Sequence, residues 1–233
     1  MSLHSDPAPS LYVPPSNQSV QISIINTTSH LKRLSCSSFF EPPIKGRDVL
    51  DCPVYSFLIE HEPCNNRLLY DPGIAKNWRK GPQIVVDRAN AFGYDASARN
   101  DVADILYSDN IQLDNIKKII GSHWHWDHTG DPSLFPPPTS LTVGPGFKAA
   151  MLPGYPTDPD SFITDSAYKG RELVEISFEQ SLKLHIGRFR ALEYFGDGNF
   201  YLLDSPGHTI GYIYICGLAR TSPKTFVLMG RRR

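Results

Sequence analysis

The chain has 233 residues, enough for one sizeable hydrophobic core and short for two. Its apolar fraction of 40% and charged fraction of 20% are those of an ordinary globular protein. The formal net charge of -1 provides no overall field that would attract nucleic acid or an anionic membrane. We therefore expect neither nucleic acid nor membrane as a partner.

We recognise neither a membrane-spanning segment nor a secretory signal in the sequence. No apolar run approaches the roughly 20 residues of a membrane-spanning helix. Residues 1–16 have neither the basic start nor the apolar stretch of a secretory signal. The four cysteines form no Cys-x-x-Cys pair, which is typical of reduced thiols. These observations predict a cytoplasmic protein.

The first third of the chain favours β-structure. Residues 1–19 are rich in proline and serine and predict a flexible N-terminal arm, with residues 20–233 as a single domain. Strands are expected at 19–28, 54–61 and 66–73, and Asp71-Pro72-Gly73 ends the last of them.

The middle of the chain mixes helix and strand. We expect a helix at 95–110, a strand at 116–123, a strand at 140–145 and a helix starting at Phe147. Residues 154–170 are rich in Pro, Asp and Gly and predict a long loop of the kind that often borders a binding site.

From residue 171 onward the pattern is β throughout, at 171–177, 181–186, 188–195, 199–216 and 225–230. Strands at both ends with a helix and strand between them favour an α+β sandwich over a doubly wound parallel sheet.

A cluster of metal-ligand residue types follows the strand predicted at 116–123. His123, His125, Asp127 and His128 occupy six positions, in a chain with eight histidines. Because alternate strand residues share a face, we expect His123 and His125 to lie side by side. Imidazole and carboxylate groups suit zinc and similar divalent metals.

A surface loop that happens to be rich in histidine is the alternative to a metal site. This pattern would arise by chance in on the order of one sequence in a thousand, so a metal site is favoured. For Trp124 and Trp126, packing in the core behind the site is favoured over stacking on a substrate. His208, in a Pro-Gly turn between two β-runs, would complete three histidines with an open fourth position.

The segments HWHWDHTG, LLDSPGHTIG and LLYDPG together resemble the metallo-β-lactamase superfamily, over roughly residues 50–230. The resemblance is strongest to the lactonase-like branch, which includes quorum-quenching N-acyl-homoserine lactonases and related fungal hydrolases. It implies a metallo-β-lactamase-like αββα sandwich with a two-metal site at one edge of the β-layers.

The resemblance also implies roles for individual residues. The first zinc would be held by His123, His125 and His208, and the second would be bound with the help of Asp127 and His128. Asp71 matches an aspartate that orients a ligand histidine in the family. Capping of its own turn is an equally good interpretation of Asp71 from the sequence alone.

The chain departs from the family pattern at its last residues. An aspartate that bridges the two metals is expected after the strand at 225–230, where Arg231 stands. We therefore expect a C-terminally truncated chain whose second αβ half is incomplete. One bound zinc is expected here, against two in intact relatives.

The resemblance implies hydrolysis of a small acyl substrate, a lactone or similar cyclic ester, through attack by metal-bound hydroxide. Asp127 would orient that hydroxide or take up its proton. Lactam and thioester hydrolysis are alternatives, because the pocket selects the acyl group. A catalytically impaired isoform that acts as a binding or regulatory partner is a further alternative, and a nuclease is disfavoured by the near-neutral charge. The identity of the substrate and the oligomeric state stay open.

Overall fold

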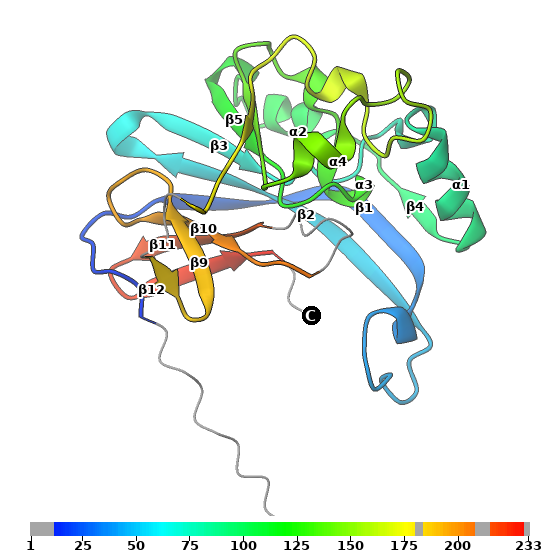
Figure 1. Ribbon diagram of the computed structural model, residues 1–233, viewed down its shortest axis with the longest axis horizontal. Coiled ribbons are helices and arrows are strands. Elements are labelled where there is room, and N and C mark those ends of the chain that lie inside the picture. Colours follow the sequence, from blue (N-terminus) through cyan, green and yellow to red (C-terminus); the bar gives the residue numbers. More distant parts are fainter. Residues whose placement is uncertain (1–11, 180–183, 208–214, 231–233) are drawn as a thin grey trace, which may run out of the picture.

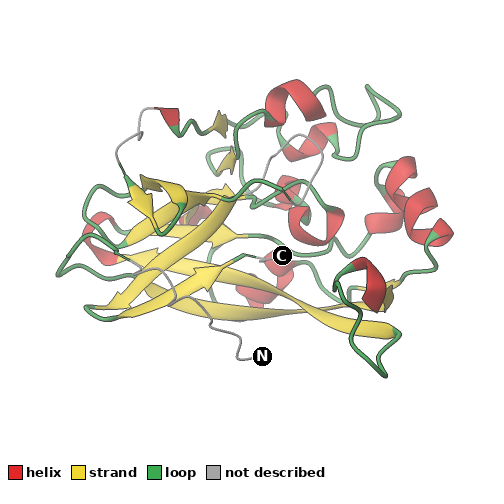
Figure 2. Ribbon diagram, turned by 60° about the horizontal axis from the view of Figure 1, so that its bottom comes forward, coloured by secondary structure: helices red, strands yellow, loops and turns green. Residues whose placement is uncertain are grey.

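The structure is a computed structural model and describes residues 12–179, 184–207 and 215–230. Two β-sheets pack against each other, and the helices lie on the outer side of the first sheet (Figures 1 and 2). The first sheet has the strand order β4-β1-β2-β3-β5-β6-β7, and the second has the order β12-β11-β10-β9-β8. This arrangement confirms the predicted α+β sandwich.

The strands of the first sheet are β1 (Gln21–Ser35), β2 (Val49–His61), β3 (Asn66–Tyr70), β4 (Asp95–Ser97), β5 (Ile116–Ile120), β6 (Ser140–Val143) and β7 (Leu173–Glu175). Those of the second sheet are β8 (His185–Ile186), β9 (Phe189–Glu193), β10 (Phe200–Asp204), β11 (Ile215–Ser222) and β12 (Thr225–Met229). The α-helices are α1 (Gln83–Ala91), α2 (Val102–Ser108), α3 (Trp126–Thr129) and α4 (Phe147–Met151). No α-helix follows α4 within the described residues.

The core forms because both faces of the central strands are apolar. In β3, Leu69 packs with the helices, whereas Leu68 and Tyr70 pack between the two sheets. In β10, Phe200 and Leu202 meet them from the opposite sheet. Alternate side chains of a strand point to opposite faces, so each of these β3 residues packs either against the helices or between the two sheets.

The direction of the strands places the histidine cluster. β3, β5, β6 and β7 run parallel to one another, so their carboxyl ends meet at one edge of the first sheet. The loop after β3 and the loop after β5 therefore lie side by side. Gly130 N–H donates to the Gly73 carbonyl at 2.8 Å and joins these two loops.

Two expected elements differ from the structure. The helix predicted at 95–110 begins only at Val102, because Asp101 and Asp104 form a capping box there and residues 95–97 pair with β1 as β4. The strand predicted at 116–123 ends at Ile120, the last residue of β5 paired with β6. Helix α1 was not predicted at all.

The described part of the N-terminal segment contacts the second sheet. Ser16 Oγ donates to the Asp197 carbonyl at 2.5 Å, and the buried Arg220 guanidinium donates to the Pro14 carbonyl at 2.5 Å. Val20 is buried between the sheets. Residues 1–11 of the arm predicted at 1–19 lie outside the described residues, so these contacts concern only its second part.

Strands β1 and β2 extend beyond the rest of the first sheet. Their pairing continues as far as Ser35 opposite Val49, and the chain turns between them over residues 36–48 (Figure 1). We call residues 31–55 the β1–β2 arm. No helix in the described residues is long and apolar enough to cross a membrane.

Tyr70 links the two sheets through its phenol group, and its removal should cost stability. The hydroxyl donates to the Ile215 carbonyl at 2.7 Å and accepts from Gly217 N–H at 3.2 Å. We expect Tyr70→Phe to lower the free energy of unfolding by about 1–3 kcal/mol, because two buried backbone groups lose a partner. Urea denaturation measures this. Tyr107→Phe on the exposed face of α2 is the control, and an equal effect of the two changes would contradict the assignment.

Gly130 allows the loops after β3 and β5 to approach each other. Its φ is 51°, and a Cβ there would lie 2.5 Å from the Pro72 Cβ. We expect Gly130→Ala to lower the free energy of unfolding by about 2–4 kcal/mol through steric overlap and backbone strain.

Gly93→Ala is the matched control in the same denaturation experiment. Gly93 also has a positive φ, of 66°, but a Cβ there would meet nothing within 4 Å. It should cost about 1 kcal/mol, the strain alone. Similar losses for both variants would show that the contact with Pro72 does not matter.

Candidate metal centre

The histidine cluster lies in the loop after β5 and in the short helix α3. Gly121 N–H donates to the Thr142 carbonyl at 3.0 Å, and Ile215 N–H donates to the Ser122 carbonyl at 2.9 Å. The start of the loop is therefore held by both sheets. His123 is buried, with 3% of its surface exposed, and His125 is the residue before the first turn of α3.

Three imidazole rings come together at this point. The ring centroid of His123 lies 4.7 Å from that of His125 and 4.2 Å from that of His128. The prediction that His123 and His125 share a strand face is wrong, because β5 ends before them. The rings meet because the loop folds back into α3.

Asp71 connects the end of β3 to this cluster. Its Oδ2 accepts from His128 Nδ1 at 2.8 Å and from Ser122 Oγ at 2.7 Å, while its Oδ1 accepts from Ser122 N–H at 2.7 Å. Asp71 is 4% exposed and adopts a positive φ of 52°. From the sequence, two roles for Asp71 were possible: contact with a ligand histidine and capping of its own turn. The structure shows the contact with the histidine, together with a hydrogen bond to the backbone of the neighbouring loop.

Ser122 extends the network to His123. Its Oγ donates to Asp71, so the same oxygen accepts from His123 Nδ1 at 2.9 Å. The Nδ1 atoms of His123 and His128 are thus engaged, and a metal would be bound through Nε2 of each ring. Ser122 was not predicted from the sequence, in which only its position directly before His123 gives a signal.

The charges of the cluster oppose the effect of burial. Burial alone would lower the pKa of His128, but the carboxylates of Asp127 and Asp71 raise that pKa to about 10. Burial alone would raise the pKa of Asp127, but His128, His123 and His125 hold it well below its ordinary value. His128 Nε2 lies 3.4 Å from Asp127 Oδ2. A metal bound by His128 therefore has to displace a proton.

The donor set fits a divalent metal in its chemistry. Imidazole nitrogens backed by a carboxylate and a hydroxyl are the usual surroundings of a zinc ligand. No group of three or more His, Cys, Asp or Glu side chains in the described residues could hold a metal ion as it stands. His208, the predicted third ligand of the first zinc, lies outside those residues.

A pocket of about 530 Å³ opens above the cluster. Its floor contains His125, Asp127 and His128, and its walls come from the β1–β2 arm and from α1 and the residues after it. Most of the lining is apolar, and many of the walls are aromatic, among them Phe39, Phe40, Tyr55, Phe92, Tyr94 and Phe162. The pocket therefore suits a largely apolar ligand.

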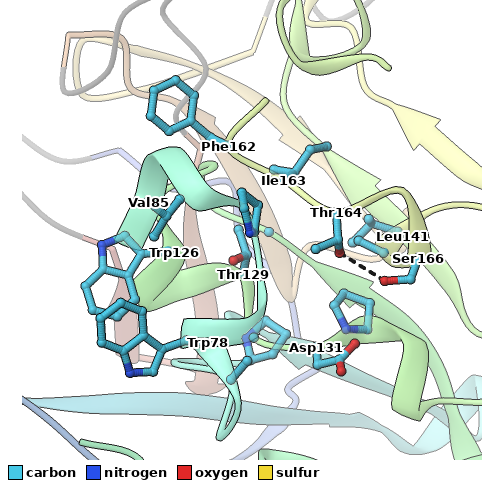
Figure 3. A pocket seen from close by; sticks show the side chains of 18 of the residues that line it. Trp78, Val85, Trp126, Thr129, Asp131, Leu141, Phe162, Ile163, Thr164 and Ser166 are labelled. Carbon is cyan, nitrogen blue, oxygen red and sulfur yellow. Dashed lines mark hydrogen bonds between the residues drawn. The ribbon is translucent and has the colours of Figure 1, made fainter. Parts of the chain in front are cut away.

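A second cavity of about 250 Å³ lies on the other side of Trp126, Val85 and Phe162 (Figure 3). Trp126 stacks on Trp78 at 4.5 Å between ring centroids, and both rings lie together in Figure 3. The loop predicted at 154–170 supplies another wall through residues 162–164. Trp124 packs in the core as expected, whereas Trp126 is partly exposed and lines both spaces.

The sequence matches the Metallo-beta-lactamase superfamily over residues 49–220. The gamma-lactamase FDB1 of Fusarium pseudograminearum is 40% identical over 95% of this chain and 55% of its own length. The metallo-hydrolase mfmC of Annulohypoxylon moriforme is 40% identical over 96% of this chain and 59% of its own length. The chain therefore spans little more than half the length of these relatives.

Solved structures share the fold at low sequence identity. A quorum-quenching N-acyl homoserine lactone lactonase aligns with a TM-score of 0.60 and 19% identity, over 93% of this chain and 74% of its own. An N-acyl homoserine lactone hydrolase, solved with N-hexanoyl-L-homoserine at its catalytic metal centre, aligns with a TM-score of 0.62 and 19% identity. That alignment covers 91% of this chain and 74% of the other. Because the family match spans most of its length, this chain belongs to the metallo-β-lactamase superfamily.

Proposed function

We propose that this chain is a zinc-dependent hydrolase that opens a lactone or a similar cyclic ester. The observation that carries the proposal is the hydrogen-bonded network of Asp71, Ser122, His123 and His128, which meets the floor of a largely apolar pocket at His128. Such a network fixes the ring orientation of ligand histidines and serves little purpose in a surface loop.

We assign His123, His125 and His208 to a first zinc and Asp127 and His128 to a second binding position. When bound, zinc lowers the pKa of a water molecule and polarises a carbonyl group. We expect one tightly bound zinc per chain, at the position with three histidine ligands. Asp71 and Ser122 would position His128 and His123 without contacting the metal.

Asp127 is the residue that we assign to proton transfer. The neighbouring histidines hold its pKa well below the ordinary range, so its carboxylate is ionised at neutral pH and can orient a water molecule by accepting a hydrogen bond. It lines the pocket beside His125 and His128, where the carbonyl group of a substrate would lie. The aromatic walls would hold the substrate ring and exclude bulk water.

A cyclic amide is the second candidate substrate class. The gamma-lactamases FDB1 and MBL2, the latter of Gibberella moniliformis, are 40% and 42% identical to this chain, whereas the lactonase structures are about 19% identical. Esters and amides are attacked at the same carbonyl carbon, so one site can serve both. N-acyl-homoserine lactones belong in the substrate panel because two of the neighbouring structures are those of an N-acyl homoserine lactone lactonase and an N-acyl homoserine lactone hydrolase.

The first test measures bound zinc and turnover in the purified chain with γ-lactones and γ-lactams. We expect about one zinc per chain and hydrolysis that a chelator abolishes and added zinc restores. His123→Ala should lose both zinc and activity. His30→Ala, which removes an exposed histidine of β1, should retain both. Absence of zinc and of turnover in the unaltered chain would refute the proposal.

Removal of the Asp71 carboxylate should weaken zinc binding without removing a ligand. We expect Asp71→Asn to lower zinc affinity by about 10–100-fold, because the amide holds His128 and Ser122 less firmly. Competition with a coloured chelator measures that affinity. Asp114→Asn, on a surface turn away from the cluster, is the control. Unchanged affinity in Asp71→Asn would remove Asp71 from the metal centre.

A further inference from the structure

Helix α1 presents one face to the pocket above the histidine cluster. Val85, Arg88 and Ala89 of α1 and Phe92, the residue directly after it, line that pocket, at the spacing i, i+3, i+4 and i+7 that places side chains on one side of a helix. Three of the four are apolar. The fourth introduces a positive charge into an otherwise largely apolar wall.

Arg88 is the sole lysine or arginine among the described side chains that line this pocket. Its guanidinium carbon lies 4.5 Å from the centroid of the Phe162 ring, which supports it from one side. In the described residues it takes part in no ion pair and its guanidinium makes no side-chain hydrogen bond. Arg88 is exposed, and the five N–H donors of its guanidinium have no acceptor among the described protein groups.

The acidic residues near Arg88 contact other side chains. Asp127 is the one carboxylate among the described lining residues, and it contacts His128 at 3.4 Å. Asp87, the neighbour of Arg88 in α1, accepts from Gln83 Nε2 at 2.8 Å and does not line the pocket. The positive charge of Arg88 therefore faces the pocket without a compensating carboxylate.

We propose that Arg88 determines substrate specificity by binding a carboxylate that the substrate carries away from its scissile bond. This rests on the proposed function and narrows its substrate class to acidic lactones or lactams. The guanidinium offers two parallel N–H donors, the geometry that a carboxylate accepts. The aromatic walls contact the body of the substrate, and its reacting carbonyl lies over His125 and His128.

Arg79 offers a comparison that tests whether Arg88 has a purely structural role. Arg79 lies 4.3 Å over the Trp78 ring, the same kind of cation–π contact, and does not line the pocket. If Arg88 served only to cover Phe162, loss of either arginine would have comparable consequences. Arg79→Gln is therefore the matched control for Arg88→Gln.

The test uses the zinc-loaded chain and two substrates that differ in one charge: γ-butyrolactone bearing a para-carboxyphenyl group and its para-carbamoylphenyl counterpart. We measure kcat and KM for each. Binding is measured separately by tryptophan fluorescence, because Trp124 and Trp126 line the pocket and Trp78 stacks on Trp126.

We expect the unaltered chain to favour the acid over the amide through KM. Arg88→Gln should reduce that preference about tenfold, the size expected for a hydrogen bond to a charged group. Arg88→Lys should restore part of it, since the charge returns without the planar fork. Arg79→Gln should leave the preference unchanged.

The outcomes separate this inference from the proposed function. Hydrolysis of both substrates with no preference for the acid, or equal effects of Arg88→Gln on acid and amide, would overturn the role of Arg88 and leave the hydrolase intact. Fluorescence binding that prefers the acid and depends on Arg88, without hydrolysis of either substrate, would support Arg88 and overturn the hydrolase. Binding without preference would overturn the inference even where turnover is absent.

Discussion

The carboxylate of Asp71 is the contact on which the arrangement of the site depends. It stands at the end of β3 and binds the backbone and side chain of Ser122 and the ring of His128, so one residue fixes both ends of the loop after β5. Buried carboxylates are costly unless their oxygens are satisfied, and here both oxygens accept hydrogen bonds. The parallel course of β3 and β5 makes this possible, since it brings the two loops to the same edge of the sheet.

The candidate ligands could be picked out from the sequence because four of them fall within six residues. Their geometry could not be predicted, because it depends on where the preceding strand ends. If the strand continued through His123, the rings of His123 and His125 would lie on the same face of the strand. β5 ends at Ile120, however, so the conformation of the following loop determines where the rings lie. The contact of Ser122 with Asp71 joins residues 51 positions apart, and no local pattern reports such a contact. Most strand positions were predictable, because apolar alternation is a local signal.

The pocket was harder to predict than the candidate metal ligands for a related reason. Its walls come from the β1–β2 arm and from α1, which are distant in sequence from the cluster and carry no motif of their own. Helix α1 was not predicted because it is short and its larger apolar residues are consecutive, at positions 84–86, rather than spaced along one helix face. Its pocket-facing side combines Val85 with Arg88, and Phe92 follows directly after the helix. Packing against tertiary neighbours, rather than local propensity, determines such a helix.

Three of the candidate ligands form the floor of the pocket, and other elements of the chain form its walls. In the proposed reaction an ester and an amide would be attacked at the same carbonyl carbon, so discrimination among cyclic substrates has to come from the residues that surround the substrate ring. Val85, Trp126 and Phe162 separate the pocket above the cluster from the second cavity, so their side chains set the depth available to a substituent. Arg88 is supported by one of these three, Phe162. Shape and charge selection are therefore coupled at Phe162, and a change there would alter both together.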